Sequence, residues 1–580
     1  MCGIVGFFSG EVHDVHDQTL TCLKRLEYRG YDSVGVATLE GEVLKDTGSI
    51  GPFMDGLGQV STRASIAHTR WATHGGVSRT NSHPHQDADG EFFVVHNGII
   101  ENADAILDGL EGKERVSETD TEVAALYFSH KVLIEGLDML DAIRHFFRDA
   151  KGTYALLVMR KGDPKVYALK KDSPMALVRS PGRHGDAVIV ASDISAFGDY
   201  SDEAVFFEDN TFCVISDDGP SFYDEHGDAI DVEYQSFEWV GTDDLEDFPH
   251  FMIKEIMEQP VTSKRLLDSL STMQADKLAE FANHMRRARR IVFLSCGTSY
   301  HASLIGAHLL SQLGYEAHTV IASEFESFIL VDQSTFVIAL SQSGETMDVI
   351  VPLKEIAKKG VKIGSIVNVP FSTIQRLSTI SLDLLAGPEI CVASTKAFTN
   401  QVLALVRLAE SLGYDADTPS VPRRISDTLE SIDKTCRELA VELKDVNDLY
   451  VLGKGAAYPM AREMALKFKE IDYMHAEGMM AGELKHGTLA LIEEGTPVVC
   501  LTPDGDPSMI SAAHEVAARG ARTIVVSNSD DGDVNVPSGC RAEFGIYACL
   551  FGHLLSYYIG VERGLEIDKP RNLAKSVTVL

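Results

Sequence analysis

The hydrophobic pattern of the chain changes near residue 250, and this change constrains the fold more than any other feature of the sequence. Before it, short apolar runs alternate with turn residues, as expected for short strands; the clearest are 92–100, 154–160, 187–192 and 211–216. After it, long helical patterns alternate with short, wholly apolar strands, which is typical of parallel βαβ sheets covered on both faces. We therefore predict an α+β part followed by an α/β part.

The N-terminal part also contains helical stretches near 14–28 and 120–134 between its expected strands. Strands and helices mixed in this way predict a layered α+β unit over residues 1–230. The sequence from 231 onward is acidic, contains scattered aromatic residues and reaches Pro249 before the pattern changes. We interpret this stretch as a linker.

Two related blocks stand in the C-terminal part. The strand IVFLS leads into CGTSYHAS (296–303), and the strand DLYVLG leads into KGAAYPMA (454–461), each opening a helix. The same order of strand, turn and helix indicates a duplicated domain. The predicted organisation is an N-terminal domain, a linker, two doubly wound parallel-sheet domains and a tail, with bounds 1–230, 231–260, 261–425, 426–565 and 566–580.

Charge and cysteine content exclude several classes of protein. The formal net charge of -34 disfavours nucleic acid as a partner, because binding a polyanion requires lysine and arginine to neutralise phosphates. The nine cysteines show neither C-x-x-C nor Cys/His ligand spacing, so we expect no metal site and no disulfide framework. The acidity also suits a protein that stays soluble at raised salt.

The sequence gives no sign of membrane insertion or export. No apolar run approaches the ~20 residues that span a bilayer. The N-terminus MCGIVGFFSG has no basic segment ahead of its apolar stretch, so we expect no signal peptide. A cytoplasmic protein without a membrane partner is predicted.

Cys2 is a candidate nucleophile, because removal of Met1 would leave a thiol and a free α-amine on one residue. Such an amine has a pKa of about 7.7 to 8.0, so it can take the thiol proton and later return it to a leaving amine. The alternative is that Cys2 is only the small first residue of a strand. Its position alone does not decide between the two.

Three polar motifs between apolar runs favour the catalytic interpretation: HTRWATHG (68–75), VHNGIIEN (95–102) and SETDTE (117–122). A glutamine substrate needs a cation for its α-carboxylate, an anion for its α-ammonium and donors for the oxyanion formed at its side-chain amide. The residues that would supply these groups are, in that order, Arg70, Asp120, and Asn97 with the Gly98 backbone N–H.

Together with CGIVG at the mature N-terminus and LEYRGYDS (26–33), these motifs resemble the class II glutamine amidotransferases, which are Ntn hydrolases built as αββα layers. The resemblance implies that Cys2 is the nucleophile and that Asn97 and Gly98 form the oxyanion hole. It also implies a glutamine-binding set of Arg70, Trp71, Thr73, His74 and Asp120. Four further histidines are expected to be structural: His68, His83, His85 and His96.

The motif SQSGET (341–346) follows the apolar strand TFVIAL and precedes a helical pattern that closes with Gly360. A strand, a hydroxyl-rich turn and a helix start can hold a phosphate through free backbone N–H groups, the positive helix end and the side chains of Ser341, Ser343 and Thr346. The alternative is an ordinary helix N-cap. The lack of a G-x-x-x-x-G-K pattern argues against a nucleoside triphosphate.

Glu463, Lys467 and Glu470 stand at i, i+4 and i+7 of one expected helix, so they share a face. A solvated stripe of ion pairs is one interpretation. The helix follows the LGKG loop, however, and the next segment, HAEGMMAGELKHG, supplies candidates for proton transfer between adjacent sugar carbons. These are His475, Glu483 and His486.

These C-terminal motifs, with VASTKAF, KFKEIDY and the tail DKPRNLAKSVTV, resemble the paired sugar isomerase (SIS) domains of the glucosamine-6-phosphate synthase family. The resemblance implies that His486 opens the sugar ring, Glu470 moves a proton between C1 and C2, and Lys575 forms a Schiff base. The implied sugar-phosphate-binding residues are Cys296, Gly297, Thr298, Ser299, Ser341, Gln342, Ser343, Thr346, Val392, Ser394 and Lys467. The sequence departs from the family pattern at two positions. KHGT has threonine where proline is expected, and the last residue is Leu580 rather than an acidic residue.

Taken together, the two resemblances imply an enzyme that moves the amide nitrogen of glutamine to fructose 6-phosphate, giving glucosamine 6-phosphate and glutamate. Ammonia would need a dry passage between the sites, with Trp71 and the tail as candidate gates. We expect no cofactor and no metal. We expect a homodimer in which His486 is contributed across the interface between the two copies. Competing interpretations are another amidotransferase, an isomerase or deglycase without ammonia transfer, and a non-catalytic sugar-phosphate sensor.

Overall fold

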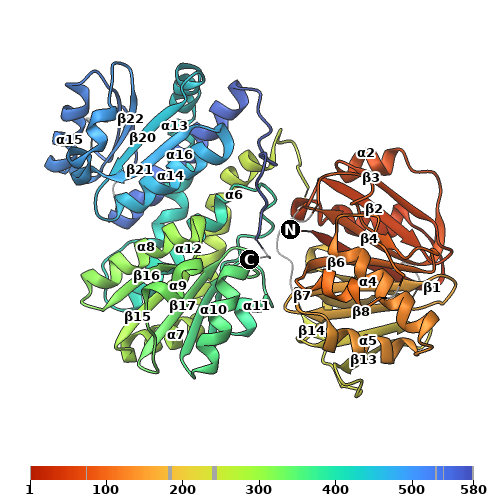
Figure 1. The fold of residues 1–580 in the computed structure, drawn as a ribbon. Helices are drawn as coiled ribbons and strands as arrows, with labels where there is room; N and C mark the ends of the chain where they lie inside the picture. Colours follow the sequence, from red (N-terminus) through yellow and green to blue (C-terminus); the bar gives the residue numbers. More distant parts are fainter. Residues whose placement is uncertain are drawn as a thin grey trace. The chain divides into compact units, whose positions relative to one another are not determined.

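The computed structural model describes residues 2–72, 75–110, 112–180, 186–237, 244–529, 532–537, 539 and 541–577, with the side chains of Asp199 and Arg541 left aside. The chain divides into two compact units (Figure 1). Unit 1 comprises Met1–Trp239 with Ser576–Leu580, and unit 2 comprises Val240–Lys575.

Unit 1 contains two sheets whose strand pairs are antiparallel. The eight-stranded sheet has the order β14-β11-β9-β10-β1-β4-β2-β3, with β1 (Gly3–Asp14), β2 (Ser33–Thr38), β3 (Val43–Thr47), β4 (Ser61–Arg70), β9 (Ala176–Ser180), β10 (Ala187–Ala191), β11 (Glu203–Phe206) and β14 (Gln235–Ser236). The six-stranded sheet has the order β13-β12-β8-β7-β6-β5, with β5 (His85–Gln86), β6 (Phe92–Ile100), β7 (Gly152–Arg160), β8 (Val166–Lys171), β12 (Thr211–Ser216) and β13 (Gly219–Asp224).

The two sheets of unit 1 pack face to face. Alternate residues of β1, such as Ile4 and Phe8, meet Phe93 and Leu157 of the six-stranded sheet in one buried cluster. The outer face of the six-stranded sheet is covered by α3 (Ala103–Asp108), α4 (Asp120–Ser129) and α5 (Met139–Asp149). On the other sheet, η1 (His16–Leu20) and α1 (Thr21–Lys24) contact β1. The expected αββα layers are therefore confirmed.

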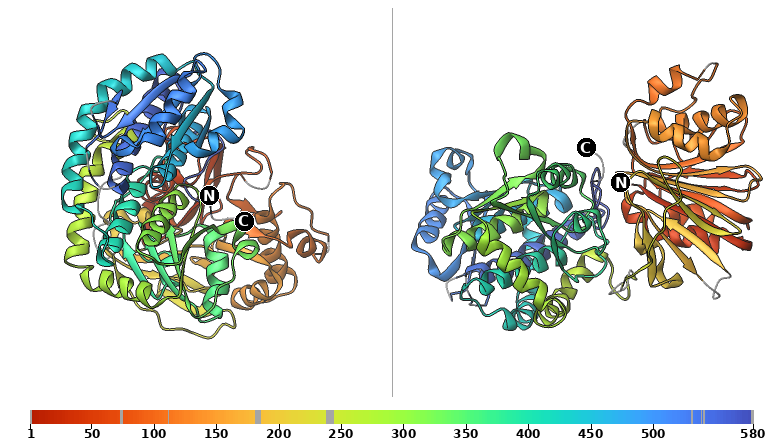
Figure 2. Two further views of the ribbon diagram at one scale, coloured as in Figure 1. Left: turned by 90° about the vertical axis from the view of Figure 1, so that its left-hand side faces the viewer. Right: turned by 90° about the horizontal axis from the view of Figure 1, so that it is seen from below.

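Unit 2 contains two five-stranded parallel sheets (Figure 2). The first has the order β16-β15-β17-β18-β19, with β15 (Arg290–Ser295), β16 (Ala317–Ile321), β17 (Thr335–Ser341), β18 (Lys362–Val367) and β19 (Ile380–Asp383). The second has the order β21-β20-β22-β23-β24, with β20 (Asp448–Gly453), β21 (His475–Met480), β22 (Pro497–Thr502), β23 (Arg522–Ser527) and β24 (Val534–Asn535). Both sheets place their second strand at one edge beside the first, so the doubly wound fold and its repetition are confirmed.

Helices cover both parallel sheets, and one hydrophobic core runs through them. This core includes Phe293 of the first sheet, Leu405 of α12, Met464 of α14 and Phe551 of α16. The helices are α6 (Phe251–Ser271), α7 (Ala275–Arg287), α8 (Gly297–Gln312), α9 (Phe325–Phe328), α10 (Met347–Lys358), α11 (Thr373–Arg376), α12 (Lys396–Ser411), α13 (Val421–Leu443), α14 (Ala457–Asp472), α15 (Pro507–Ala517) and α16 (Arg541–Glu562). The repeated blocks predicted from sequence are β15 with α8 and β20 with α14.

The expectation that no apolar run approaches the length of a membrane span was wrong for helix α16, which is long and apolar enough to cross a membrane; 94% of its most apolar window is, however, buried within the protein. It packs against α13 and α14, so its apolar surface is explained by its place in the core of unit 2.

The described residues of the stretch predicted as the linker, 231–260, contain regular secondary structure. It includes β14 and the first half of α6, which begins at Phe251 and continues through Pro260. The helix accommodates this internal proline, although proline lacks the backbone N–H that a helix interior normally uses. The exact domain bounds stay a prediction.

Candidate active sites

Cys2 lies at the start of the central strand β1 of unit 1. Because β1 pairs with β4, the end of β4 comes alongside, and the Trp71 N–H donates to Cys2 Sγ at 3.3 Å. The Asn97 side-chain amide on β6 donates to the Cys2 carbonyl at 2.7 Å. Burial raises the pKa of the Cys2 thiol, while the Trp71 N–H and the Arg70 charge oppose the rise. The thiol therefore needs a base to become a nucleophile.

Gly98 follows Asn97 on β6 and has a φ of +128°. A Cβ atom at this position would overlap the Thr153 carbonyl on the neighbouring strand β7. Glycine is therefore required by both backbone conformation and space. The strand therefore places the Asn97 side chain at the Cys2 backbone, with Gly98 next to it along β6.

Arg70 and Asp120 lie on the same side of unit 1 as Cys2. The buried Arg70 guanidinium donates to the carbonyls of Gly75 and Gly76, each at 3.2 Å. Burial lowers the pKa of Arg70, while the charges of Cys2, Asp32 and Asp120 oppose this. Asp120 starts α4 and accepts from the Ile100 N–H at 2.7 Å. The other two candidates, Thr73 and His74, lie outside the described residues.

The four histidines expected to be structural, His68, His83, His85 and His96, form a buried cluster in unit 1. The His68 and His83 rings stack at 4.1 Å, and His85 meets His83 edge-on at 4.7 Å. His83 and His96 both contact the Thr121 hydroxyl, at 2.8 and 3.0 Å. Burial lowers the pKa of His68 to about 3 and that of His83 and His85 well below the ordinary value. Neutral rings of this kind pack β4 and β6 against the start of α4.

In unit 2, the turn from β15 into α8 joins the two repeats. Thr298 and His301 lie on one face of α8 and both reach Glu463 on α14, at 3.0 and 2.7 Å. Ser299 accepts from Gln401 of α12 at 2.9 Å. Cys296 is the N-cap residue of α8, and Gly297 has a φ of +53°.

The SQSGET turn lies between β17 and α10 and is shaped by its own hydrogen bonds. Ser341 Oγ accepts from the Gly344 N–H at 2.9 Å and lies 3.1 Å from Thr346 Oγ1. Ser343 Oγ accepts from the Glu345 N–H at 3.2 Å. Gly344 has a φ of +66°. Gln342 is partly exposed. This turn ends at the first N–H groups of α10, where an anion is favoured.

Two of the α14 residues of the candidate site, Glu463 and Lys467, are fully buried and Glu470 is partly buried, so they do not form a solvated ion-pair stripe. The Lys467 ammonium lies 3.2 Å from Glu463 and 2.6 Å from Glu470, and the side chains of Glu463 and Lys467 are inaccessible. Burial acts against the charge of Glu463, but Lys467 and His301 lower its pKa to about 2. Burial raises the pKa of Glu470, although Lys467 opposes the rise. A carboxyl group shifted in this direction is suited to accept and return a proton.

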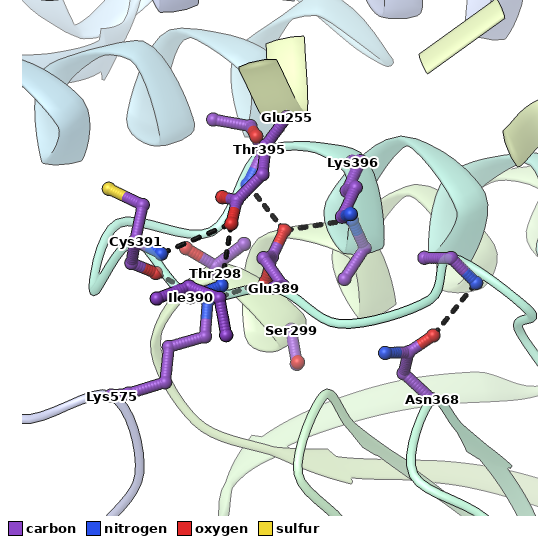
Figure 3. A network of polar contacts seen from close by, with 12 residues as sticks. Glu255, Thr298, Ser299, Asn368, Glu389, Ile390, Cys391, Thr395, Lys396 and Lys575 are labelled. Carbon is purple, nitrogen blue, oxygen red and sulfur yellow. Dashed lines mark hydrogen bonds and ion pairs between the residues drawn. The ribbon is translucent and has the colours of Figure 1, made fainter. Parts of the chain in front are cut away.

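Lys575 lies in the tail, which is held against the first repeat. The Asp568 carboxylate accepts from the N–H groups of Phe251 and Met252, and its carbonyl accepts from Val392. Lys575 Nζ then donates to Glu389 at 2.6 Å and to the Cys391 carbonyl at 2.8 Å (Figure 3). Ser394, in the same loop, is partly exposed. The tail therefore places the Lys575 amine against the loop that contains Val392 and Ser394.

The structure does not place His486 in contact with the other candidate residues of the sugar site. It is exposed at the end of η8 (Ala481–His486), and within the described residues no hydrogen bond or ion pair joins it to Glu470. His475 pairs with Asp448 at 3.2 Å on the surface, and Glu483 is exposed. In one copy of the chain, the site holding Glu470 and Lys575 thus lacks the predicted ring-opening histidine.

Three residues at the site were not singled out from sequence: His301, Glu389 and Glu255. His301 stands three residues after Thr298, a spacing that signals a shared helix face. Glu389 and Glu255 lie in the apolar stretches LLAGPEICV and HFMIKEIM. An acidic residue within an apolar stretch indicates that its carboxylate is buried. Within the described residues, no cluster of histidine, cysteine or acidic side chains is arranged to hold a metal ion.

Comparison with known proteins assigns both units. Residues 68–199 match the glutamine amidotransferase domain, and residues 284–411 and 442–536 match the SIS domain. The fold and sites thus define a glutamine amidotransferase joined to paired SIS domains. The C-terminal domain of glucosamine-fructose-6-phosphate aminotransferase from Francisella tularensis has a TM-score of 0.51 and 30% identity, covering 56% of this chain and 100% of that chain.

Full-length relatives define the family more closely. The chain is 38% identical over 615 residues to the glutamine--fructose-6-phosphate aminotransferase (isomerizing) of Pyrococcus horikoshii, covering 100% of both chains. It is 38% identical over 609 residues to the protein of the same name from Methanothermobacter thermautotrophicus, again with 100% of both covered. The chain therefore belongs to the glutamine--fructose-6-phosphate aminotransferase (isomerizing) family, and the resemblance drawn from its motifs is confirmed.

Proposed function

We propose that the chain converts D-fructose 6-phosphate and L-glutamine into D-glucosamine 6-phosphate and L-glutamate, the first step of hexosamine biosynthesis. The observation that carries the proposal is the buried Lys575 amine, held 2.6 Å from Glu389 in the loop that also carries Val392 and Ser394. An amine placed in this way is suited to condense with a ketone. The full-length relatives named for this reaction support the assignment.

The first half-reaction takes place in unit 1. Once Met1 is removed, the α-amine of Cys2 takes the thiol proton, and the thiolate attacks the side-chain amide carbon of glutamine. Asn97 and Gly98 donate to the oxyanion, and the protonated α-amine gives its proton to the departing ammonia. Water then hydrolyses the thioester to glutamate. Arg70 and Asp120 hold the carboxylate and ammonium groups of the substrate.

The second half-reaction takes place in unit 2. The SQSGET turn and the start of α8 hold the phosphate, His486 opens the sugar ring, and Lys575 condenses with the C2 carbonyl. Ammonia displaces the lysine, and Glu470 transfers a proton between C1 and C2 to give the amino aldehyde. Lys467 holds Glu470 in place. Amide nitrogen and a protein amine supply the chemistry, so no cofactor is required.

We extend the proposal to the assembly and location of the chain. Since His486 is exposed and away from Glu470 in one copy, it is proposed to complete the site of a second copy in a homodimer. Ammonia would pass between the sites without entering bulk water, where it is mostly protonated. The enzyme is proposed to act in the cytoplasm.

The test incubates the purified full-length chain with glutamine and fructose 6-phosphate and measures glutamate and glucosamine 6-phosphate together. We expect the two products to form one for one. Cys2→Ala should abolish both. Glu470→Gln should lower amino sugar formation by about 10²- to 10⁴-fold while glutamate still forms, because it removes only the carbon-bound proton transfer.

Other outcomes would support a competing function. Glutamate without amino sugar would reject the acceptor and favour another amidotransferase, to be tried with other phosphosugars. Isomerised sugar without glutamate would favour an isomerase, and binding of the sugar phosphate with neither product would favour a sensor. Equal loss of both products in Glu470→Gln would contradict the separate role given to that carboxylate.

A further inference from the structure

Glu389 is a buried carboxylate fixed from two sides. It lies in the loop between β19 and α12, and its Oε1 accepts from the Thr395 and Ala397 N–H groups at 2.9 and 3.0 Å. These donors belong to the start of α12, where a negative charge is favoured. Its Oε2 accepts from Lys575 Nζ at 2.6 Å, as Figure 3 shows. The side chains of Glu389 and Lys575 are 0% and 2% exposed.

The surroundings favour the charged form of Glu389 and disfavour the charged form of the neighbouring Glu255. Burial acts against the charge of Glu389, but the Lys575 ammonium and the two N–H donors hold its pKa below the usual value. Glu255 on α6 accepts from Ile390 and Cys391 N–H, and burial raises its pKa to about 8. Glu389 is the carboxylate that contacts the Lys575 amine directly.

We propose that Glu389 is the positioning residue for the imine-forming amine: anchored by the start of α12, it holds Lys575 Nζ against the Cys391 carbonyl and remains its counter-ion throughout imine formation. The inference rests on the proposed function, because it concerns the same sugar site. It gives a role in the reaction to a carboxylate that contacts Lys575 and belongs to none of the predicted site residues.

Charge balance explains why a fixed carboxylate suits this step. The lysine ammonium and the ketone combine to give a protonated imine and water: the C=O bond breaks, a C=N bond forms, and two ammonium protons leave on the water oxygen. The nitrogen carries one positive charge before and after. The buried ion pair therefore persists, and the large cost of leaving a buried charge without a partner is avoided.

The network offers a matched control. On α12, Lys396 pairs with Glu258 of α6 at 2.6 Å, and this pair belongs to the same group of charges but does not contact Lys575. Glu258→Gln therefore removes a neighbouring carboxylate by the same chemical change. Glu389→Asp keeps the charge but shortens its reach.

The experiment incubates the full-length protein with fructose 6-phosphate, reduces it with borohydride and measures the Lys575–sugar adduct by mass spectrometry from pH 5 to 9. Glu389→Gln should lower the adduct at neutral pH by about tenfold to a hundredfold, because a charge-assisted hydrogen bond is lost. It should also move the acid side of the pH profile down by about 1 to 3 units, since no carboxylate then favours the ammonium.

The other titratable groups around the Lys575–Glu389 pair stay in place in that variant: Glu255 on α6, Cys391 in the loop, Lys396 on α12, Glu470 on α14, His553 on α16, and Asp568 in the tail. Glu258→Gln should leave both the adduct yield and the profile unchanged. Glu389→Asp should restore the profile with a lower yield. Circular dichroism and glutamate release check that each variant is folded.

The outcomes separate this inference from the proposed function. If the unaltered chain gives no Lys575 adduct, the Schiff base of the proposed function fails. If the unaltered chain gives the adduct and folded Glu389→Gln gives the same yield and profile, the role of Glu389 is overturned. A lower yield with an unshifted profile, or an equal change in Glu258→Gln, would make Glu389 a purely structural residue.

Discussion

Glu255 carries a carboxyl group whose charged form is disfavoured by burial. Its Oε1 accepts from the Ile390 N–H at 2.5 Å and the Cys391 N–H at 3.1 Å. Its Oε2 is buried and has no hydrogen-bond partner in the described part of the chain. Because burial and the nearby Glu389 charge raise its pKa to about 8, the acid form predominates at pH 7.

This leads us to predict that Glu255→Gln is tolerated, because an amide presents the same carbonyl acceptor as the neutral acid. The folded state binds the proton more tightly than the unfolded state, so this group costs stability as pH rises from about 4.5 to 8. Compared with the unaltered chain, Glu255→Gln should gain stability over that range, by up to about 1.4 kcal/mol per pH unit. Denaturant unfolding at pH 5, 6.5 and 8 measures this difference.

A relative loss of stability at pH 8 would mean that Glu255 is ionised in the native protein, and would reject the prediction. Glu258→Gln is the control, since Glu258 is partly exposed and paired with Lys396. The stability difference between Glu258→Gln and the unaltered chain should therefore not grow with pH.

Sequence alone predicts those residues whose partners are close in the chain. Glu463, Lys467 and Glu470 share a helix face by spacing, and the structure joins them in one buried network. The contacts of Glu255 and Glu389 with the loop and the tail span 135 and 186 residues. No local pattern reports such distances. The spacing of acidic residues along the chain therefore does not show which carboxylate becomes the counter-ion of a distant lysine; the tertiary fold is needed for that.

At the scale of a single element, the SQSGET turn depends on one glycine. Gly344 has a φ of +66°, and a Cβ atom there would overlap the Ser372 side chain at the start of α11. Gly344→Ala should therefore distort the turn and raise the KM for fructose 6-phosphate by about tenfold or more, beyond the roughly 1 kcal/mol cost of the left-handed conformation. Steady-state kinetics with saturating glutamine measures the change.

Gly314→Ala is the matched control for this prediction. Gly314 follows α8, has a φ of +85° and has no atom near the position of a Cβ. The substitution should cost about 1 kcal/mol of stability from backbone strain and leave the KM unchanged. If Gly344→Ala behaves in the same way as Gly314→Ala, the turn does not hold the phosphate.

Elements were predictable where their hydrophobic pattern is regular. The strand predicted at 92–100 is β6, and that at 211–216 is β12, because a run of apolar residues bounded by turns leaves little choice. Helix α6 begins inside the stretch predicted as a linker and accommodates Pro260 in its interior. The helical stretch at 14–28 divides into η1, α1 and η2 (Glu27–Arg29), a subdivision that hydrophobic period alone does not resolve.

At the scale of the whole molecule, the formal net charge of -34 is the dominant electrostatic feature. Like charges repel most strongly in the compact state, so excess negative charge lowers the free energy of unfolding at low ionic strength. Salt reduces this repulsion, because the Debye length falls from about 10 Å at 0.1 M to about 3 Å at 1 M. Salt also weakens surface ion pairs such as Lys264 with Asp268.

The repulsion should outweigh the lost ion pairs. Exposed pairs contribute only about 0 to 1 kcal/mol each, and buried pairs such as Lys575 with Glu389 are little affected by salt. We therefore predict that the midpoint of thermal unfolding rises steadily from 0.05 to 2 M KCl. Sucrose at matched osmolality serves as the uncharged control and should give a smaller rise. A midpoint that falls with KCl would show that surface ion pairs, rather than net charge, set the salt response.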